Sequence, residues 1–129
     1  MRQVTAAVIV EDGQMLLVRR APSESLAGYW ELPGGKLEDG ESLESCLERE
    51  LSEELAMGSA VGEALARTIY HYEHGSFEMV ALRTQRLTGF ELSVHDRFIW
   101  ASSDDIADLQ LAPADVDLID QLLTLGHWR

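Results

Sequence analysis

The chain has 129 residues, a length that suits one domain with a hydrophobic core. Its formal net charge of −13 argues against a groove for nucleic-acid polymers and against binding to an anionic membrane, because both need clustered Lys and Arg. A small phosphate ester stays compatible with this charge if a metal ion and a few basic residues screen it. Cys46 is the only cysteine, so no internal disulfide forms and a cytoplasmic location is expected.

The first residues indicate β structure. Residues 5–10 form an apolar run that is too short for the hydrophobic region of a signal peptide, and we expect a strand. A second strand is predicted at residues 15–19, and the Asp12-Gly13 pair between the two runs indicates a hairpin. Arg19 and Arg20 close the second strand, where such charges are ordinarily solvated.

Residues 41–56 are predicted to form a helix. They contain no Gly or Pro and consist mostly of Glu, Leu, Ser and Arg, and the cluster Asp39-Gly40-Glu41-Ser42 supplies the start. Cys46 borders the apolar stripe and is expected to pack there rather than act as a nucleophile. The stripe consists of Leu43, Leu47, Leu51 and Leu55.

Three acids of this helix, Glu50, Glu53 and Glu54, fall within a sector of roughly 100° that overlaps the edge of the stripe. Carboxylates crowded beside a core repel one another and lose hydration, so they need protonation, cationic partners or a bound cation. Arg49 is placed to pair with Glu53, but one arginine cannot neutralise three glutamates. Mg²⁺ or Mn²⁺ held by carboxylates and substrate phosphates is the usual solution.

The same segment resembles the Nudix box: Gly, five residues, Glu, seven residues, then Arg-Glu-apolar-any-Glu-Glu-any-Gly-apolar. Ala56 stands where the family has Gly, at a helix end that often needs positive φ. Either Ala56 accepts that strain, at about 1 kcal/mol, or the helix continues to a cap at Gly58. The matching residues are Gly35, Glu41, Arg49-Glu50-Leu51-Ser52-Glu53-Glu54-Leu55 and Met57.

The resemblance implies roles for these residues. Arg49, Glu53 and Glu54 would be the catalytic group, in which Arg49 orients the acids and Glu53 acts as a base through water. The cofactor would be Mg²⁺, with Mn²⁺ as the alternative, and the number of ions is left open. The implied metal ligands are the carbonyl of Gly35 and the carboxylates of Glu50, Glu53 and Glu54.

Residues 29–36, Tyr-Trp-Glu-Leu-Pro-Gly-Gly-Lys, resemble a segment of MutT-like hydrolases. Leu32 is either plain core or a residue that packs on the base of a nucleotide. Lys36 either meets phosphate or is a solvated turn residue. Arg20 resembles in position a phosphate-contacting arginine of MutT-type members.

The middle of the chain is rich in β-branched and aromatic residues at alternating positions. Residues 64–73 and 76–87 are predicted to be two long strands. A short strand near residues 90–93 is predicted to precede the segment 95–100, which ends in Trp100.

Many family members carry a further metal-binding or basic Glu just before such a strand. By count its counterpart here is Val94, which is followed by His95 and Asp96. Asp96 is therefore an alternative to Glu53 as the base, or the site relies on the acids of the helix alone.

The C-terminal part predicts two helices. The segment Ser102-Ser103-Asp104-Asp105 is typical of a capped start, and a short helix is expected through Asp108. An amphipathic helix follows Pro113. Its apolar residues are Val116, Leu118, Ile119, Leu122 and Leu123.

Asp115 has two interpretations. At a helix start an acid is favoured by the dipole, as an ordinary capping residue. In MutT-like proteins the matching segment carries an Asn or Asp that reads the edge of the base. We expect Asp115 to be ionised near neutral pH, and therefore to favour the N4 amino group of cytosine over bases that present a carbonyl there.

The resemblance implies that residues 1–129 form a single Nudix domain, an α/β/α sandwich with a curved mixed sheet. It also implies hydrolysis of a nucleoside triphosphate to the monophosphate and pyrophosphate, with cytosine nucleotides such as CTP or dCTP as candidates. The alternatives are 8-oxo-dGTP, ADP-ribose or a nucleotide sugar as substrate, a non-catalytic nucleotide or metal sensor, and an acidic protein-interaction module. The oligomeric state is left open.

Overall fold

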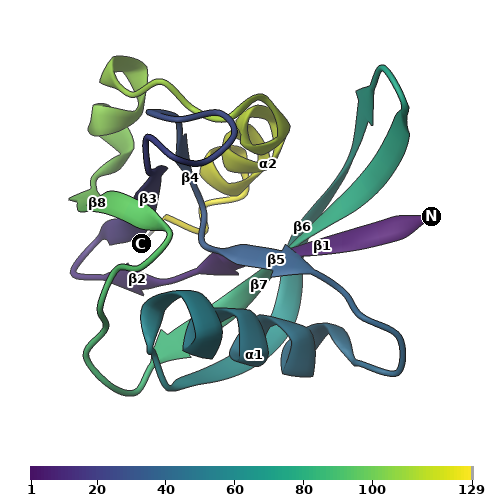
Figure 1. The fold of residues 1–129 in the computed structure, drawn as a ribbon. Helices are drawn as coiled ribbons and strands as arrows, with labels where there is room; N and C mark the ends of the chain where they lie inside the picture. The colour runs from purple at the N-terminus through teal and green to yellow at the C-terminus, as the bar shows by residue number, and fades with distance from the viewer. Residues whose placement is uncertain (129) are drawn as a thin grey trace.

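The computed structural model describes residues 1–128, so Arg129 of the predicted domain lies outside the described residues. Two α-helices, one 3-10 helix and eight strands make up the described part (Figure 1). In chain order they are β1 (Arg2–Val8), β2 (Val10–Glu11), β3 (Gln14–Arg20), β4 (Trp30–Glu31), β5 (Gly34–Lys36), α1 (Leu43–Leu55), β6 (Ser59–Tyr72), β7 (Gly75–Arg86), β8 (His95–Ala101), η1 (Ser103–Asp108) and α2 (Pro113–Thr124).

The strands form two sheets. The first has the order β5-β1-β7-β6, in which β1 and β7 run parallel and the other pairs are antiparallel. The second has the order β2-β3-β4, and β8 pairs with β3. The turn between β2 and β3 contains Asp12 and Gly13, both with positive φ, as the hairpin predicted there requires. The mixed sheet expected from the sequence is confirmed.

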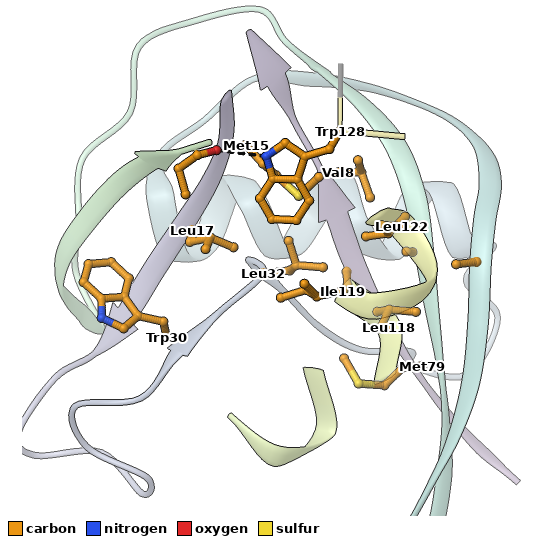
Figure 2. Close-up of a cluster of buried hydrophobic side chains, with 14 residues drawn as sticks. Val8, Met15, Leu17, Trp30, Leu32, Met79, Leu118, Ile119, Leu122 and Trp128 are labelled. Atoms are coloured by element: carbon orange, nitrogen blue, oxygen red, sulfur yellow. Dashed lines mark hydrogen bonds between the residues drawn. The ribbon is translucent and has the colours of Figure 1, made fainter. Parts of the chain in front are cut away.

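The two helices cover opposite sides of the strands (Figure 1). Side chains alternate along a strand, so β1 sends Ala7 to the core under α1 but Ala6 and Val8 to the core under α2, and Ile9, just after the strand, continues the alternation toward α1. Figure 2 shows the second core, where side chains of both sheets meet α2. The expected α/β/α sandwich is therefore formed, and no helix among residues 1–128 is long and apolar enough to span a membrane.

Helix α1 has the predicted apolar stripe, with Leu47, Leu51 and Leu55 buried. Ser42 caps its start through a reciprocal pair of bonds with Ser45. At its end Ala56 adopts φ 50, ψ 36, the left-handed conformation usually taken by Gly. Of the two options for this position, Ala56 accepts the strain and the helix does not continue to Gly58.

Two expectations were wrong. Residues 90–93 form no strand, because this segment satisfies the end of α1: Glu91 N–H donates to the carbonyl of Leu55 and the Ser93 hydroxyl to that of Glu54, both at 2.8 Å. Val116 of α2 is 47% exposed and lies outside the core, which takes Leu118, Ile119 and Leu122 from that helix.

Candidate active site

A cavity of about 630 Å³ lies among the described residues, and we call it the main cavity. Its wall combines β1, β7 and β5 of the first sheet with Glu31 and Leu32, residues of α1, Val94 and His95, and Asp115 of α2. Elements from the whole length of the chain thus meet around one space.

Glu50 and Glu54 project from α1 into the main cavity, and we call them the acid pair. Gly35 of β5 makes room for the first of them, since a Cβ built on Gly35 would lie 2.2 Å from Cδ of Glu50. The carbonyl of Gly35 accepts hydrogen bonds from the Thr5 hydroxyl at 3.1 Å and from the Cys46 thiol at 3.8 Å. The glycine of this turn therefore serves the close approach of a carboxylate.

The acid pair resists ionisation. Burial raises the pKa of Glu54 to about 7, and the neighbouring charge of Glu50 adds to this effect. Burial also raises the pKa of Glu50, against the opposing effect of Arg49. Two half-buried carboxylates of this kind, beside a backbone carbonyl, form an all-oxygen donor set that a hard divalent cation would stabilise.

Arg49 lies behind the acid pair and organises several acids. Its Nε lies 2.6 Å from Oε2 of Glu41, and its Nη1 lies 3.0 Å from Glu50 and 3.1 Å from Glu53. Its Nη2 donates to the carbonyl of Lys36 at 3.2 Å. The hydrogen bond from Arg49 lowers the pKa of Glu41 to about 2. The predicted pairing of Arg49 is confirmed, and it links the turn before the helix to the helix itself.

Glu53 differs from its two neighbours. Its side chain is 60% exposed, it pairs with Arg49, and it is absent from the wall of the main cavity. Within residues 1–128, no three His, Cys, Asp or Glu side chains lie close enough together to hold a metal ion. The three glutamates expected to converge are therefore not brought together, because the Arg49 guanidinium attracts the third one.

Asp96 also lies away from the main cavity. Its carboxylate forms a two-point ion pair with Arg19, with 2.6 Å between Oδ2 and Nη2. The strand β8 alternates, so the residue before Asp96 faces the cavity instead. That residue is His95, which together with Val94 forms part of the wall.

Glu31 and His95 are site residues that the sequence analysis missed. His95 Nε2 lies 3.0 Å from Oε2 of Glu31, and Arg20 Nη1 lies 3.3 Å from each oxygen of the same carboxylate. A signal was present in the sequence, because Glu31 stands between Trp30 and Leu32 in an extended segment. With those two apolar neighbours facing the core, the acid between them must face the other way.

All four expected substrate residues, Arg20, Leu32, Lys36 and Asp115, line the main cavity. Lys36 is exposed, and Arg20 is half-buried and tied to Glu31 and Ser25. Leu32 is only 4% exposed and lies next to Ile119 of α2 in the second core (Figure 2). It is therefore both a core residue and part of the cavity wall.

Asp115 corrects one expectation. It is 3% exposed, and burial raises its pKa to about 8, with a further contribution from the charge of Glu31. The hydrogen bond from the Leu32 N–H opposes this effect without cancelling it. Asp115 is thus protonated near neutral pH, whereas we expected an ionised carboxylate, because loss of hydration outweighs the favourable helix terminus.

Comparisons with known proteins show which family this chain belongs to. A family model described as NUDIX domain matches residues 4–121. The chain is 35% identical to the CTP pyrophosphohydrolase of Escherichia coli K12, over 100% of this chain and 96% of that protein. It is 30% identical to the 8-oxo-dGTP diphosphatase of Haemophilus influenzae, over 97% and 93%. The solution structure of the E. coli ORF135 protein has a TM-score of 0.88 at 33% identity, over 100% of this chain and 93% of that one.

Proposed function

This chain belongs to the Nudix hydrolase family, and we propose that it cleaves a nucleoside triphosphate to the monophosphate and pyrophosphate with Mg²⁺, as a cytoplasmic MutT-like enzyme. The observation that carries the proposal is the arrangement of the main cavity. The acid pair lies in its wall beside Gly35, and the same wall carries Leu32 and Asp115. One cavity therefore offers a cation site for phosphates and a partly apolar site for a base.

The proposed metal ligands are the carbonyl of Gly35 and the acid pair, with Glu53 as a further carboxylate that a bound cation would have to draw away from Arg49. When bound, such a cation supplies charge neutralisation on the phosphate oxygens and lowers the pKa of a bound water. Arg49 holds Glu50 in place, and Lys36 and Arg20 are proposed to meet the phosphates. Glu53 is the proposed base, which takes the proton of the attacking water through a second water.

We propose cytosine nucleotides, CTP, dCTP or a 5-substituted dCTP, as the preferred substrates. The E. coli relative named for CTP supports this, as does Asp115 in the cavity wall. Oδ2 of Asp115 is engaged by Leu32, so the other oxygen is free for a ligand. Once Asp115 is ionised, this oxygen can only accept, and it then suits the N4 amino group of cytosine, which uracil and thymine lack.

The second candidate is 8-oxo-dGTP. It is favoured by the protonated state of Asp115, because a neutral carboxyl group both donates and accepts. A guanine edge, with one N–H and one carbonyl, matches such a group. The Haemophilus relative is named for this nucleotide.

The proposal is tested by a screen for pyrophosphate release with Mg²⁺ and with Mn²⁺. The panel contains CTP, dCTP, 5-methyl-dCTP, UTP, dTTP, dGTP and 8-oxo-dGTP, with ADP-ribose and a nucleotide sugar as other diphosphate derivatives. We expect the highest kcat/KM for a cytosine nucleotide. Cleavage of only the last two compounds, into two monophosphates, would place the chain with other Nudix activities. Binding without turnover would indicate a sensor.

A further inference from the structure

Thr5 is a buried polar residue to which the proposed function gives no role. It lies on β1, directly opposite Gly35 of β5 in the antiparallel pair, and it is 1% exposed. Its hydroxyl donates to the carbonyl of Gly35 at 3.1 Å. That carbonyl is a proposed metal ligand, so Thr5 acts directly on an atom of the cation site.

The Cys46 thiol is a second donor at the same carbonyl, and it has two acceptors within reach. Its sulfur lies 3.8 Å from the carbonyl oxygen of Gly35 and 3.5 Å from the hydroxyl oxygen of Thr5. Burial raises the pKa of this thiol, so the group keeps its proton near neutral pH. A thiol carries a single proton, so a full hydrogen bond goes to one of these oxygens at a time.

Thr5 makes both positions of the thiol proton possible. Its hydroxyl hydrogen is committed to Gly35, while its oxygen still has lone pairs to offer. In one arrangement both groups donate to the carbonyl, and both lone pairs of the carbonyl are engaged. In the other, the thiol donates to Thr5 and Thr5 donates to the carbonyl. Only the second arrangement leaves a lone pair of this carbonyl free to bind a cation.

The place of Cys46 on α1 determines which side of the carbonyl the thiol covers. Cys46 and Glu50 stand at i and i+4, so they lie about one turn apart on the same face of the helix. Glu50 comes so close to Gly35 that a Cβ built there would lie 2.2 Å from its Cδ. The thiol therefore approaches the carbonyl from the side of the acid pair, where it competes with a cation.

We propose that Thr5 and Cys46 form a two-position donor pair that opens the Gly35 carbonyl when a cation binds. The thiol turns from the carbonyl to the Thr5 hydroxyl, and the hydrogen bond from Thr5 continues to hold the carbonyl in place. The inference rests on the proposed function, in which this carbonyl is a metal ligand. Thr5 and Cys46 are positioning residues, since each acts on the cation through the carbonyl.

The thiol can be observed directly, because Cys46 is the only cysteine of the chain. Its S–H stretching band in the infrared spectrum reports one group, and the band moves to higher frequency when the acceptor is weaker. A hydroxyl is a weaker acceptor than an amide carbonyl, so Mg²⁺ should raise the S–H frequency of the wild type. Cys46→Ala, which lacks the band, identifies it. Binding of Mg²⁺ without movement of this band would overturn the inference.

Mn²⁺ affinity, measured by calorimetry, tests the pair with a double-substitution cycle. Thr5→Val keeps the shape but removes the alternative acceptor, so the thiol stays on the carbonyl and competes with the cation. We expect Thr5→Val to weaken Mn²⁺ binding about 2- to 10-fold, the equivalent of one hydrogen bond. Cys46→Ala alone should have little effect, because the wild-type thiol turns away. The double variant should bind Mn²⁺ more tightly than Thr5→Val.

Two controls separate this mechanism from a packing effect. Thr5→Ser keeps the hydroxyl and should keep the wild-type affinity for Mn²⁺. Thr84→Val removes another buried hydroxyl of the same sheet, which donates to the carbonyl of Leu82, and should leave Mn²⁺ binding unchanged. Melting temperatures show whether each variant is folded, and the infrared measurement on the wild type needs no variant to fold except the one that identifies the band.

Equal Mn²⁺ affinities of Thr5→Val and the double variant would also overturn the inference, because the thiol would then not compete with the cation. Failure of the proposed function is distinguishable from this outcome. In that case the wild type would hydrolyse no triphosphate, whereas failure of this inference alone leaves turnover and Mn²⁺ binding of the wild type intact.

Discussion

The carboxylate of Asp115 accepts a hydrogen bond from the backbone N–H of Leu32, with 2.9 Å between Oδ2 and the nitrogen. The contact joins the start of α2 to the segment between β4 and β5, and both residues are at least 95% buried. It satisfies an amide that would otherwise be buried without a partner. It also holds an acid where its ionised form is disfavoured, which has consequences for stability and for recognition.

Stability should fall as pH rises from about 4 to 8, where Asp115 ionises in the unfolded chain but stays protonated in the folded one. Its pKa rises from 3.8 when unfolded to about 8 in the folded chain, so its contribution is present below about pH 4 and is lost as pH rises to 8. Asp115→Asn removes this component. Even half of the shift corresponds to about 3 kcal/mol, so the variant should gain on the wild type by that amount between pH 3 and pH 9. Urea unfolding measures this, with the exposed Asp117→Asn as control. Parallel pH curves would contradict it.

The same residue should set base selectivity. We expect kcat/KM for CTP and dCTP to exceed that for UTP and dTTP, because only cytosine offers an amino group to the free oxygen of Asp115. The ratio should increase between pH 7 and pH 9, as the carboxyl becomes an acceptor only. Asp115→Asn, which keeps shape but always carries a donor, should flatten both the preference and its pH dependence. Equal values for cytosine and uracil nucleotides would make Asp115 an ordinary capping acid.

Glu54→Gln should abolish most turnover while the fold is kept. The substitution preserves shape and removes the charge that a divalent cation needs, so kcat should fall by about 10²-fold or more. Circular dichroism and Mn²⁺ titration check the fold and the metal site separately. Glu48→Gln is the matched control, because Glu48 lies exposed on the same helix. Near-wild-type activity of the Glu54 variant would sink its assignment as a metal ligand.

The general base of the reaction should be Glu53 on α1 and not Asp96 on β8. Asp96 pairs with Arg19 outside the main cavity, so Asp96→Asn should leave kcat close to the wild-type value. Glu53→Gln should lower it by about 10²- to 10⁴-fold, the usual contribution of a general base. Single-turnover rates for both variants separate chemistry from product release. If Glu53→Gln keeps full kcat and Asp96→Asn loses it, the base lies in the later segment.

Arg49→Lys should lower both activity and metal affinity, although it keeps the positive charge. The guanidinium reaches Glu41, Glu50, Glu53 and the carbonyl of Lys36 at once, and a single ammonium cannot reproduce that fork. We expect a loss of about 10- to 100-fold in kcat/KM, as for other residues that orient metal ligands, together with weaker Mn²⁺ binding. Arg83→Lys, at an exposed pair with Glu63, is the control. An unchanged Mn²⁺ affinity would show that Arg49 does not orient the acids.

Local features of this fold were readable from the sequence. The leucine stripe of α1, its cap at Ser42 and the hairpin at Asp12-Gly13 depend on residues within a few positions of one another. Their spacing alone indicates the structure. The Nudix box is likewise a local pattern, which is why the family could be inferred, and roles for Glu50 and Glu54 proposed, from the sequence alone.

Other features depended on packing between distant segments. Glu31 meets His95, 64 positions later, and Asp115 binds the Leu32 amide, 83 positions earlier. Asp115 is protonated near neutral pH because tertiary packing buries it, which no helix-terminus rule could reveal. Glu53 turns to Arg49 and away from the cavity. The position of that guanidinium depends on Glu41, in the turn before the helix, as well as on Glu50 of α1. Protonation and orientation depend on burial and on neighbours in space, and these exist only once the chain has folded.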